Sequence, residues 1–192
     1  MMKRFSAGLI AVFLLVAPGA ALAQNAPVVL FIDQAKLMAT SKAGQSINEQ
    51  LAELAKDAET SIQAEGQKVE AEGKQLQAAQ DQLSKEDFGK RYQALVVKAQ
   101  NVGRLEQIKK AEIAQAQGKA LNELNEHLQP VVKDILDKRK ATVLLERSAV
   151  IYADDDMDIT DEIVKALDRK VKRVKVEKVD LLAQAEQAQR NR

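Results

Sequence analysis

Few residues of this 192-residue chain could do chemistry. It contains no cysteine, so it has neither a thiol nucleophile nor a disulfide. The one histidine, His127, has no second histidine at metal-ligand spacing, and such a residue in a helical stretch is usually a surface or packing residue. Neither a Gly-x-Ser-x-Gly elbow nor a glycine-rich phosphate loop occurs. We therefore expect no enzyme, no cofactor and no metal.

The densest group of possible metal ligands is the acidic run at 154–158, which places carboxylates at alternate positions as a calcium loop does. Its sixth position is Ile159, where such a loop needs glycine, and its twelfth is Lys165, where it needs glutamate. We interpret the run as a polar turn. Thr160 is then expected to be the N-cap of a helix that begins with two acidic residues and buries Ile163, Val164 and Leu167.

The N-terminus has the pattern of a secretory signal. Lys3 and Arg4 precede an apolar run over 9–17, and Ala21-Leu22-Ala23 provides the small residues of a cleavage site. The run is shorter than the roughly 20 residues that span a bilayer, so cleavage after residue 23 is expected, with an uncleaved anchor as the alternative. Removal of residues 1–23 changes the formal net charge from +1 to −1. A near-neutral exported chain is not a general nucleic-acid binder, and we expect at most a weak contact with a membrane surface.

Composition favours long helices over a conventional globular core. Aromatic residues make up only 3% of the chain and tryptophan is absent, whereas charged residues make up 30%. After the signal, the only prolines are Pro27 and Pro130, which leaves about a hundred residues without a proline to break a helix.

Between residues 47 and 127, apolar or small residues recur mostly every three, four or seven positions, as in a coiled-coil seam. The polar stretch 84–87 interrupts this pattern. The first seam consists of Ile47, Leu51, Leu54, Ala58, Ile62, Val69, Leu76 and Leu83, and the second includes Phe88, Leu95, Val102, Ile113 and Leu124.

A reversal of the chain at about Lys85–Glu86 would bring residues whose numbers sum to 171 face to face. Val69 then faces Val102, and the clear mismatch is Ile62 opposite Lys109. Residues 47–83 carry a net charge of −5 and residues 85–119 a net charge of +4, which favours the same pairing. We therefore predict an antiparallel helical hairpin arm over residues 47–127.

Residues 24–46 and 128–170 are expected to form a small body. A continuous apolar run after Pro27 predicts a buried strand, and two β-branched runs at 142–146 and 149–153 predict a strand pair joined by Arg147-Ser148. A short helical turn through Leu37 and a loop at 41–44 precede the arm, and the second long helix should continue through Pro130 to about Lys140. The expected body and oligomer strands contain Val29, Leu30, Phe31, Ile32, Val143, Leu145, Val150 and Tyr152.

So small a set of strands cannot enclose a large core, which predicts oligomerisation through the strands. The tail at 171–192, in which valines and leucines alternate with many charges, is expected to be helical or disordered. The fold class is therefore α+β and predominantly helical.

This order of elements resembles the Skp/OmpH family of periplasmic chaperones over about residues 27–168. The residues that carry the resemblance are Val29–Asp33, Ser41–Gly44, Val143–Leu145, Ala149–Ala153 and, most specifically, Asp158–Ile163. The resemblance implies a periplasmic homotrimer whose three arms surround a cavity and hold unfolded outer-membrane proteins without nucleotide.

Two other functions stay open from the sequence. One is a structural or adaptor protein whose hairpin contacts a single fixed envelope partner. The other is a carrier of lipid or lipopolysaccharide, which would need an apolar groove wider than the seam found here, and the near-neutral charge also argues against lipopolysaccharide binding.

Overall fold

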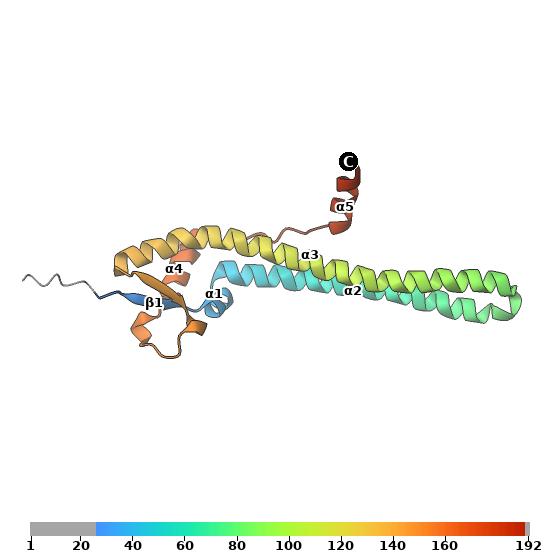
Figure 1. Ribbon diagram of the computed structural model, residues 1–192, viewed down its shortest axis with the longest axis horizontal. Helices are drawn as coiled ribbons and strands as arrows, with labels where there is room; N and C mark the ends of the chain where they lie inside the picture. Colours follow the sequence, from blue (N-terminus) through green and yellow to red (C-terminus); the bar gives the residue numbers. More distant parts are fainter. Residues whose placement is uncertain (1–25, 191–192) are drawn as a thin grey trace, which may run out of the picture.

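Two long helices dominate the computed structural model, which describes residues 26–190. Helix α2 (Lys42–Ala78) has 37 residues and α3 (Lys85–Arg139) has 55. They run side by side in opposite directions and form an arm that extends from a small body (Figure 1). The predicted α+β fold with a long helical hairpin is confirmed. The expected export signal, residues 1–23, lies outside the described residues.

The body is built around a two-stranded parallel sheet. Strand β1 pairs with β2 in a register that places Val29 opposite Val143. The pairing is parallel because the whole arm is the crossover that returns the chain to the same end. The elements of the body are β1 (Val29–Ile32), α1 (Gln34–Thr40), β2 (Val143–Glu146), the 3-10 turns η2 (Arg147–Ala149) and η3 (Asp155–Met157), and α4 (Thr160–Lys170).

The predicted strand pair within 142–153 is wrong. Residues 143–146 form β2, but Val150 and Tyr152 lie in a loop, and β2 pairs with β1 instead. A two-residue hairpin turn needs residues that accept positive φ, and Arg147-Ser148 forms a 3-10 turn at negative φ that carries the chain out of the sheet. The other edge of β1 is occupied where Phe31 bridges Asp158, so β1 is nearly buried.

Three side chains cap the helices that lead into and out of the arm. Asp33 accepts from the backbone N–H of Lys36 at 2.8 Å and begins α1, and Ser84 accepts from that of Asp87 at 3.1 Å and begins α3. Ser41 accepts from the N–H of Gly44 at 3.1 Å and begins α2. The expected loop at 41–44 is therefore the cap and first turn of a helix.

The chain reverses slightly earlier than predicted. Helix α2 ends at Ala78, the 3-10 turn η1 (Gln80–Gln82) follows, and α3 begins at Lys85. The polar residues at 84–87 interrupt the seam because they cap and open the second helix: Asp87 also accepts a hydrogen bond from the Ser84 hydroxyl. The predicted reversal at Lys85–Glu86 was thus the start of α3.

Helix α3 passes through Pro130 as predicted and ends where Lys140 adopts a left-handed conformation with φ 55°. The prediction that Thr160 caps α4 is wrong, because Thr160 is already the first residue of that helix. Its hydroxyl is buried and accepts from the backbone N–H of Asp33 at 2.8 Å, while Asp158 accepts from the N–H of Thr160 at 2.8 Å. Thr160 therefore connects the start of α4 with the start of α1.

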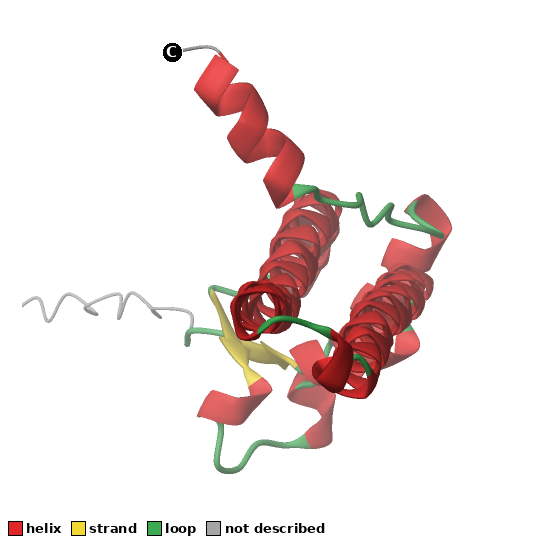
Figure 2. Ribbon diagram, turned by 90° about the vertical axis from the view of Figure 1, so that its right-hand side faces the viewer, coloured by secondary structure: helices red, strands yellow, loops and turns green. Residues whose placement is uncertain are grey.

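A single apolar core connects the body with the base of the arm. It contains Ile163 and Leu167 of α4, as predicted, together with Ile47 of α2 and Leu124 of α3. Beyond α4 the chain is extended over residues 171–180 before α5 (Leu181–Arg190), and four valines of the extended segment also belong to the core. The expectation that the tail is wholly helical or disordered is therefore wrong for 171–180. Figure 2, which looks along the arm, shows the segment 171–180 as a loop that crosses between the two long helices.

Candidate functional site

The arm is the largest surface that the fold offers, and its seam is unevenly packed. Near the body, Ile47 and Ala58 of α2 are buried, as are Ala116, Ala120 and Leu124 of α3. Further out the predicted seam residues are only half-buried. This half-buried group comprises Ile62, Val69, Leu76 and Leu83 on the first helix side and Phe88, Leu95 and Val102 on the second, and Leu51, Leu54 and Ile113 near the base are also half-buried.

The predicted register agrees with the contacts along the arm. Val69 and Val102 line the same hollow between the helices, and Ala58 and Ile113 line another. Glu72 of α2 forms an ion pair with Lys98 of α3, one residue from the predicted register. In the structure every predicted seam residue is buried or half-buried.

The mismatch of Ile62 with Lys109 lies beside a hollow in the seam. A hollow of about 340 Å³ lies there between α2 and α3, and it is lined by Ala58, Ile62, Lys109 and Ile113 among others. A second hollow of about 180 Å³ involves Ala58 and Ile113 as well. A hollow of about 330 Å³ also lies beside the matched pair Val69 and Val102, so loose packing is not confined to the mismatch.

The outer half of α3 exposes apolar side chains. The rings of Phe88 and Tyr92 stack with centroids 6.4 Å apart and an interplanar angle of 11°. Tyr92 and Val97 are each 54% exposed, and Val96 is exposed nearby. A polar arm that presents single apolar side chains can make weak contacts with many partners without forming one deep pocket.

Charged side chains cover the remainder of the arm. Among the described residues the ion pairs on the arm lie mostly within one helix at spacings of three or four, and each is weak because it is exposed. In one of them, the Lys74 ammonium lowers the pKa of Glu70, and Glu70 in turn raises the pKa of Lys74. These charges keep the arm in water, and only the Glu72–Lys98 pair joins the two long helices of the described chain.

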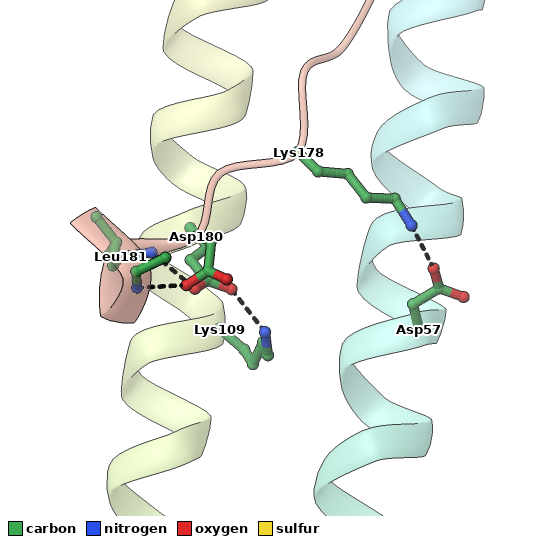
Figure 3. A network of polar contacts seen from close by, with 7 residues as sticks. Asp57, Lys109, Lys178, Asp180 and Leu181 are labelled. Carbon is green, nitrogen blue, oxygen red and sulfur yellow. Dashed lines mark hydrogen bonds and ion pairs between the residues drawn. The ribbon is translucent and has the colours of Figure 1, made fainter. Parts of the chain in front are cut away.

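The sequence analysis missed a polar cluster where the extended tail crosses the arm (Figure 3). Lys178 pairs with Asp57 of α2 at 3.1 Å, and the backbone N–H of Leu181 donates to Glu112 of α3 at 3.1 Å. Glu112 is only 6% exposed and also pairs with Lys109 at 2.8 Å. The signal in the sequence was the four-residue spacing that places Glu112 on the same helix face as Ala116, Ala120 and Leu124, where a carboxylate needs partners.

The other candidates for chemistry are dispersed. His127 is exposed on α3, and the acidic run at 154–158 forms the turn η3 with its neighbours. Within residues 26–190, no group of three or more His, Cys, Asp or Glu side chains is placed to hold a metal ion. In the same part of the chain, none of the helices combines the length and apolar character needed to cross a membrane.

The predicted oligomer strands are divided between the core and the surface. Leu30, Phe31 and Ile32 are buried within one chain, and Val29 is half-buried, whereas Val143 and Leu145 are exposed on β2. The loop after β2 adds the fully exposed Ile151 and the largely exposed Tyr152, and Val150 is half-buried. Strand β2 and the loop after it thus expose apolar residues on the body.

These features define a class: a small α+β body from which a single helical hairpin projects. The OmpH family model, whose description is outer membrane protein (OmpH-like), matches residues 28–167. The chain therefore belongs to the OmpH-like family, which confirms the resemblance inferred from its sequence.

A solved structure agrees with this assignment. The chain is similar to the crystal structure of an OmpH-like outer membrane chaperone from Caulobacter crescentus CB15, with 25% sequence identity and a TM-score of 0.74. The match covers 81% of this chain and 92% of the other. A comparison with curated proteins gives no match.

Proposed function

We propose that this protein is a periplasmic chaperone that holds unfolded outer-membrane proteins without nucleotide. The observation that carries the proposal is the projecting arm of α2 and α3, whose outer half is polar but presents half-buried and exposed apolar side chains. Membership of the OmpH-like family and similarity to an outer membrane chaperone support it.

The mechanism follows from weak and numerous contacts. An unfolded β-barrel chain has unpaired strand edges and alternating apolar residues, and it aggregates edge to edge unless it is kept apart from its neighbours. Side chains such as Tyr92 and Val97 can each contact such a chain without docking it tightly. Several arms acting together create affinity through multivalency, and the individually weak contacts allow release without an energy source.

We further propose that three copies assemble through their bodies and surround a cavity with their arms. The exposed apolar residues of β2 and the following loop support self-association, since Val143 and Leu145 are each 38% exposed and Ile151 is fully exposed. Export by a cleaved signal over residues 1–23 belongs to the same proposal.

Suppression of aggregation tests the proposed function. Several unrelated outer-membrane β-barrels are unfolded in urea and diluted into buffer with or without the purified mature chain, and light scattering is recorded. The proposal expects protection of each client when about one trimer is present per client. If the clients precipitate equally with and without the chain, the proposal is wrong, and protection of one partner alone would indicate an adaptor.

Matched variants test whether the arm makes the contact. Replacing the exposed Val96 and Val97 by serine should weaken protection, because it removes apolar contact area at two exposed residues that are outside the predicted seam. Replacing the exposed polar Gln93 and Gln100 of the same helix by serine is the control and should leave protection unchanged.

A further inference from the structure

The extended segment at 171–180, here called the strap, occupies a groove between the two long helices near the base of the arm. Val171, Val174, Val176 and Val179 are buried there, and Val174 has no exposed surface. The intervening residues are charged and exposed. The strap lies beyond residues 28–167, which the family model matches, so its role is not part of that match.

The groove recognises the backbone of the strap through Gln50 of α2. The Gln50 Nε2 donates to the carbonyl oxygen of Val174 at 2.8 Å, and its Oε1 accepts from the N–H of Val176 at 3.1 Å. Nε2 also donates to the carbonyl oxygen of Ser46 at 2.8 Å, which fixes the orientation of the amide. A carbonyl and an N–H two residues apart are the groups that an edge strand presents, so this contact fits any extended chain.

The surroundings of the strap define what else the groove can accept. Lys172 and Arg173 share a hollow with the acidic Glu49 and Glu53 of α2, and Lys178 pairs with Asp57 on the same helix. The groove therefore fits a segment with apolar residues facing inward and basic residues facing α2. Because Gln50 contacts only backbone atoms of the strap, the groove can accept different side chains between the apolar residues.

The groove also continues past the strap. A hollow of about 180 Å³ beside Val179 extends along the arm and is lined by Leu54, Ser61 and Ile113. In Figure 3 the chain turns away from α2 at this level and reaches α3 through Asp180 and Leu181. An incoming chain could contact this free portion first and then replace the strap.

We propose that the groove is a binding site for an extended segment of an unfolded client, and that the strap is an internal occupant which the client displaces. The inference rests on the proposed chaperone function. The occupant has the character of a membrane β-strand, with β-branched residues inward at Val174 and Val176 and a charged residue between them. The strap thus covers the client-binding groove when no client is present.

Release of the strap tests this proposal in the full chain. Val174→Asp places a carboxylate at a fully buried position and should detach the strap, whereas Leu182→Asp adds the same charge at an exposed position of α5 and serves as the control. Affinity for a fluorescently labelled, urea-unfolded outer-membrane β-barrel is measured by anisotropy. We expect binding about threefold tighter or more for V174D, because a larger fraction of the chain has an open groove, and no change for L182D.

A double variant separates groove binding from simple loosening of the arm. Val174→Asp combined with Gln50→Leu should lose the gain, because Gln50 then no longer contacts the backbone of the client. If the gain persists in the double variant, the client does not occupy the groove and the proposal is wrong. Equal client affinity of V174D and the native chain also overturns it, provided that loss of the carbodiimide cross-link between Lys178 and Asp57 shows the strap to be released.

A reversible lock keeps the proposal testable if V174D does not fold. The chain has no cysteine, so Asp57→Cys with Lys178→Cys, both exposed, can be joined by a cleavable bismaleimide. Locking should weaken client binding and cleavage should restore it; unchanged binding contradicts the proposal. If the native chain prevents aggregation but these variants all bind alike, only this inference fails. If no form prevents aggregation, the proposed function fails as well.

Discussion

Gly44 lies where α2 starts against α1, and a side chain there has no room. A Cβ atom at this position would lie 2.4 Å from the carbonyl oxygen of Met38, which is backbone and cannot rotate away. Gly44→Ala should therefore lower the stability by about 1–3 kcal/mol through overpacking. Gly66→Ala on the same helix meets nothing within 4 Å and should stabilise by about 0.5–1 kcal/mol. Urea midpoints measure both, and equal effects would contradict the close packing of α1 on α2.

The body also depends on the hydrogen bond that the Thr160 hydroxyl accepts from the backbone N–H of Asp33. Thr160→Val keeps the shape but removes the acceptor for the backbone N–H of Asp33, so a loss of about 1–3 kcal/mol is expected. Thr60→Val on the exposed face of the arm is the control and should cost less than about 0.5 kcal/mol. Denaturation with urea compares the two, and a neutral Thr160→Val would show that this hydrogen bond does not stabilise the body.

At the scale of single residues, the sequence showed that Thr160 would matter but not which contact it would make. An acceptor followed by an acidic first turn made Thr160 a good N-cap candidate, but the position of β1 decides that its hydroxyl meets Asp33 instead. That contact spans 127 positions in sequence, and no local rule contains it. The need for glycine at position 44 likewise comes from the approach of α1.

At the scale of elements, the ion pair between Glu72 and Lys98 offers a test of the hairpin register in the native chain. A carbodiimide joins a carboxylate to an amine only when they are in direct contact, so we expect a cross-linked peptide that joins these two residues. Mass spectrometry detects it, and Glu72→Gln should abolish it. Predominant links between Glu72 and other lysines of α3 would require a different register.

The long helices and the short elements β1 and α4 were predictable, whereas the conformations of 149–153 and of the strap were not. Seam residues such as Val69 and Val102 repeat over many turns, so a single mismatch such as Lys109 opposite Ile62 does not obscure the period. The segment 149–153 has strand-forming residues, but strand formation depends on a partner, and β1 is already paired on both edges. The strap was missed for a similar reason: its valines are buried only because Gln50 and the two long helices provide a groove.

At the scale of the whole molecule, assembly should depend on the exposed side of the body. Leu145→Glu places a charge on β2 where Val143 and Leu145 are exposed and should shift the chain from trimer to monomer. Leu182→Glu, also at an exposed leucine, should leave the trimer intact. Sedimentation velocity distinguishes these states. If Leu145→Glu remains trimeric, the bodies do not meet through β2.

The most direct test of the account is the mass of the complex in solution. The mature chain is mixed with an unfolded outer-membrane β-barrel as it is diluted from urea, and the mixture is analysed by native mass spectrometry. The account predicts a species of three chains with one client, and a trimer without client in the absence of the β-barrel. A chain that stays monomeric, or a trimer that retains no client, would contradict the proposal that arms of an assembled body hold unfolded proteins between them.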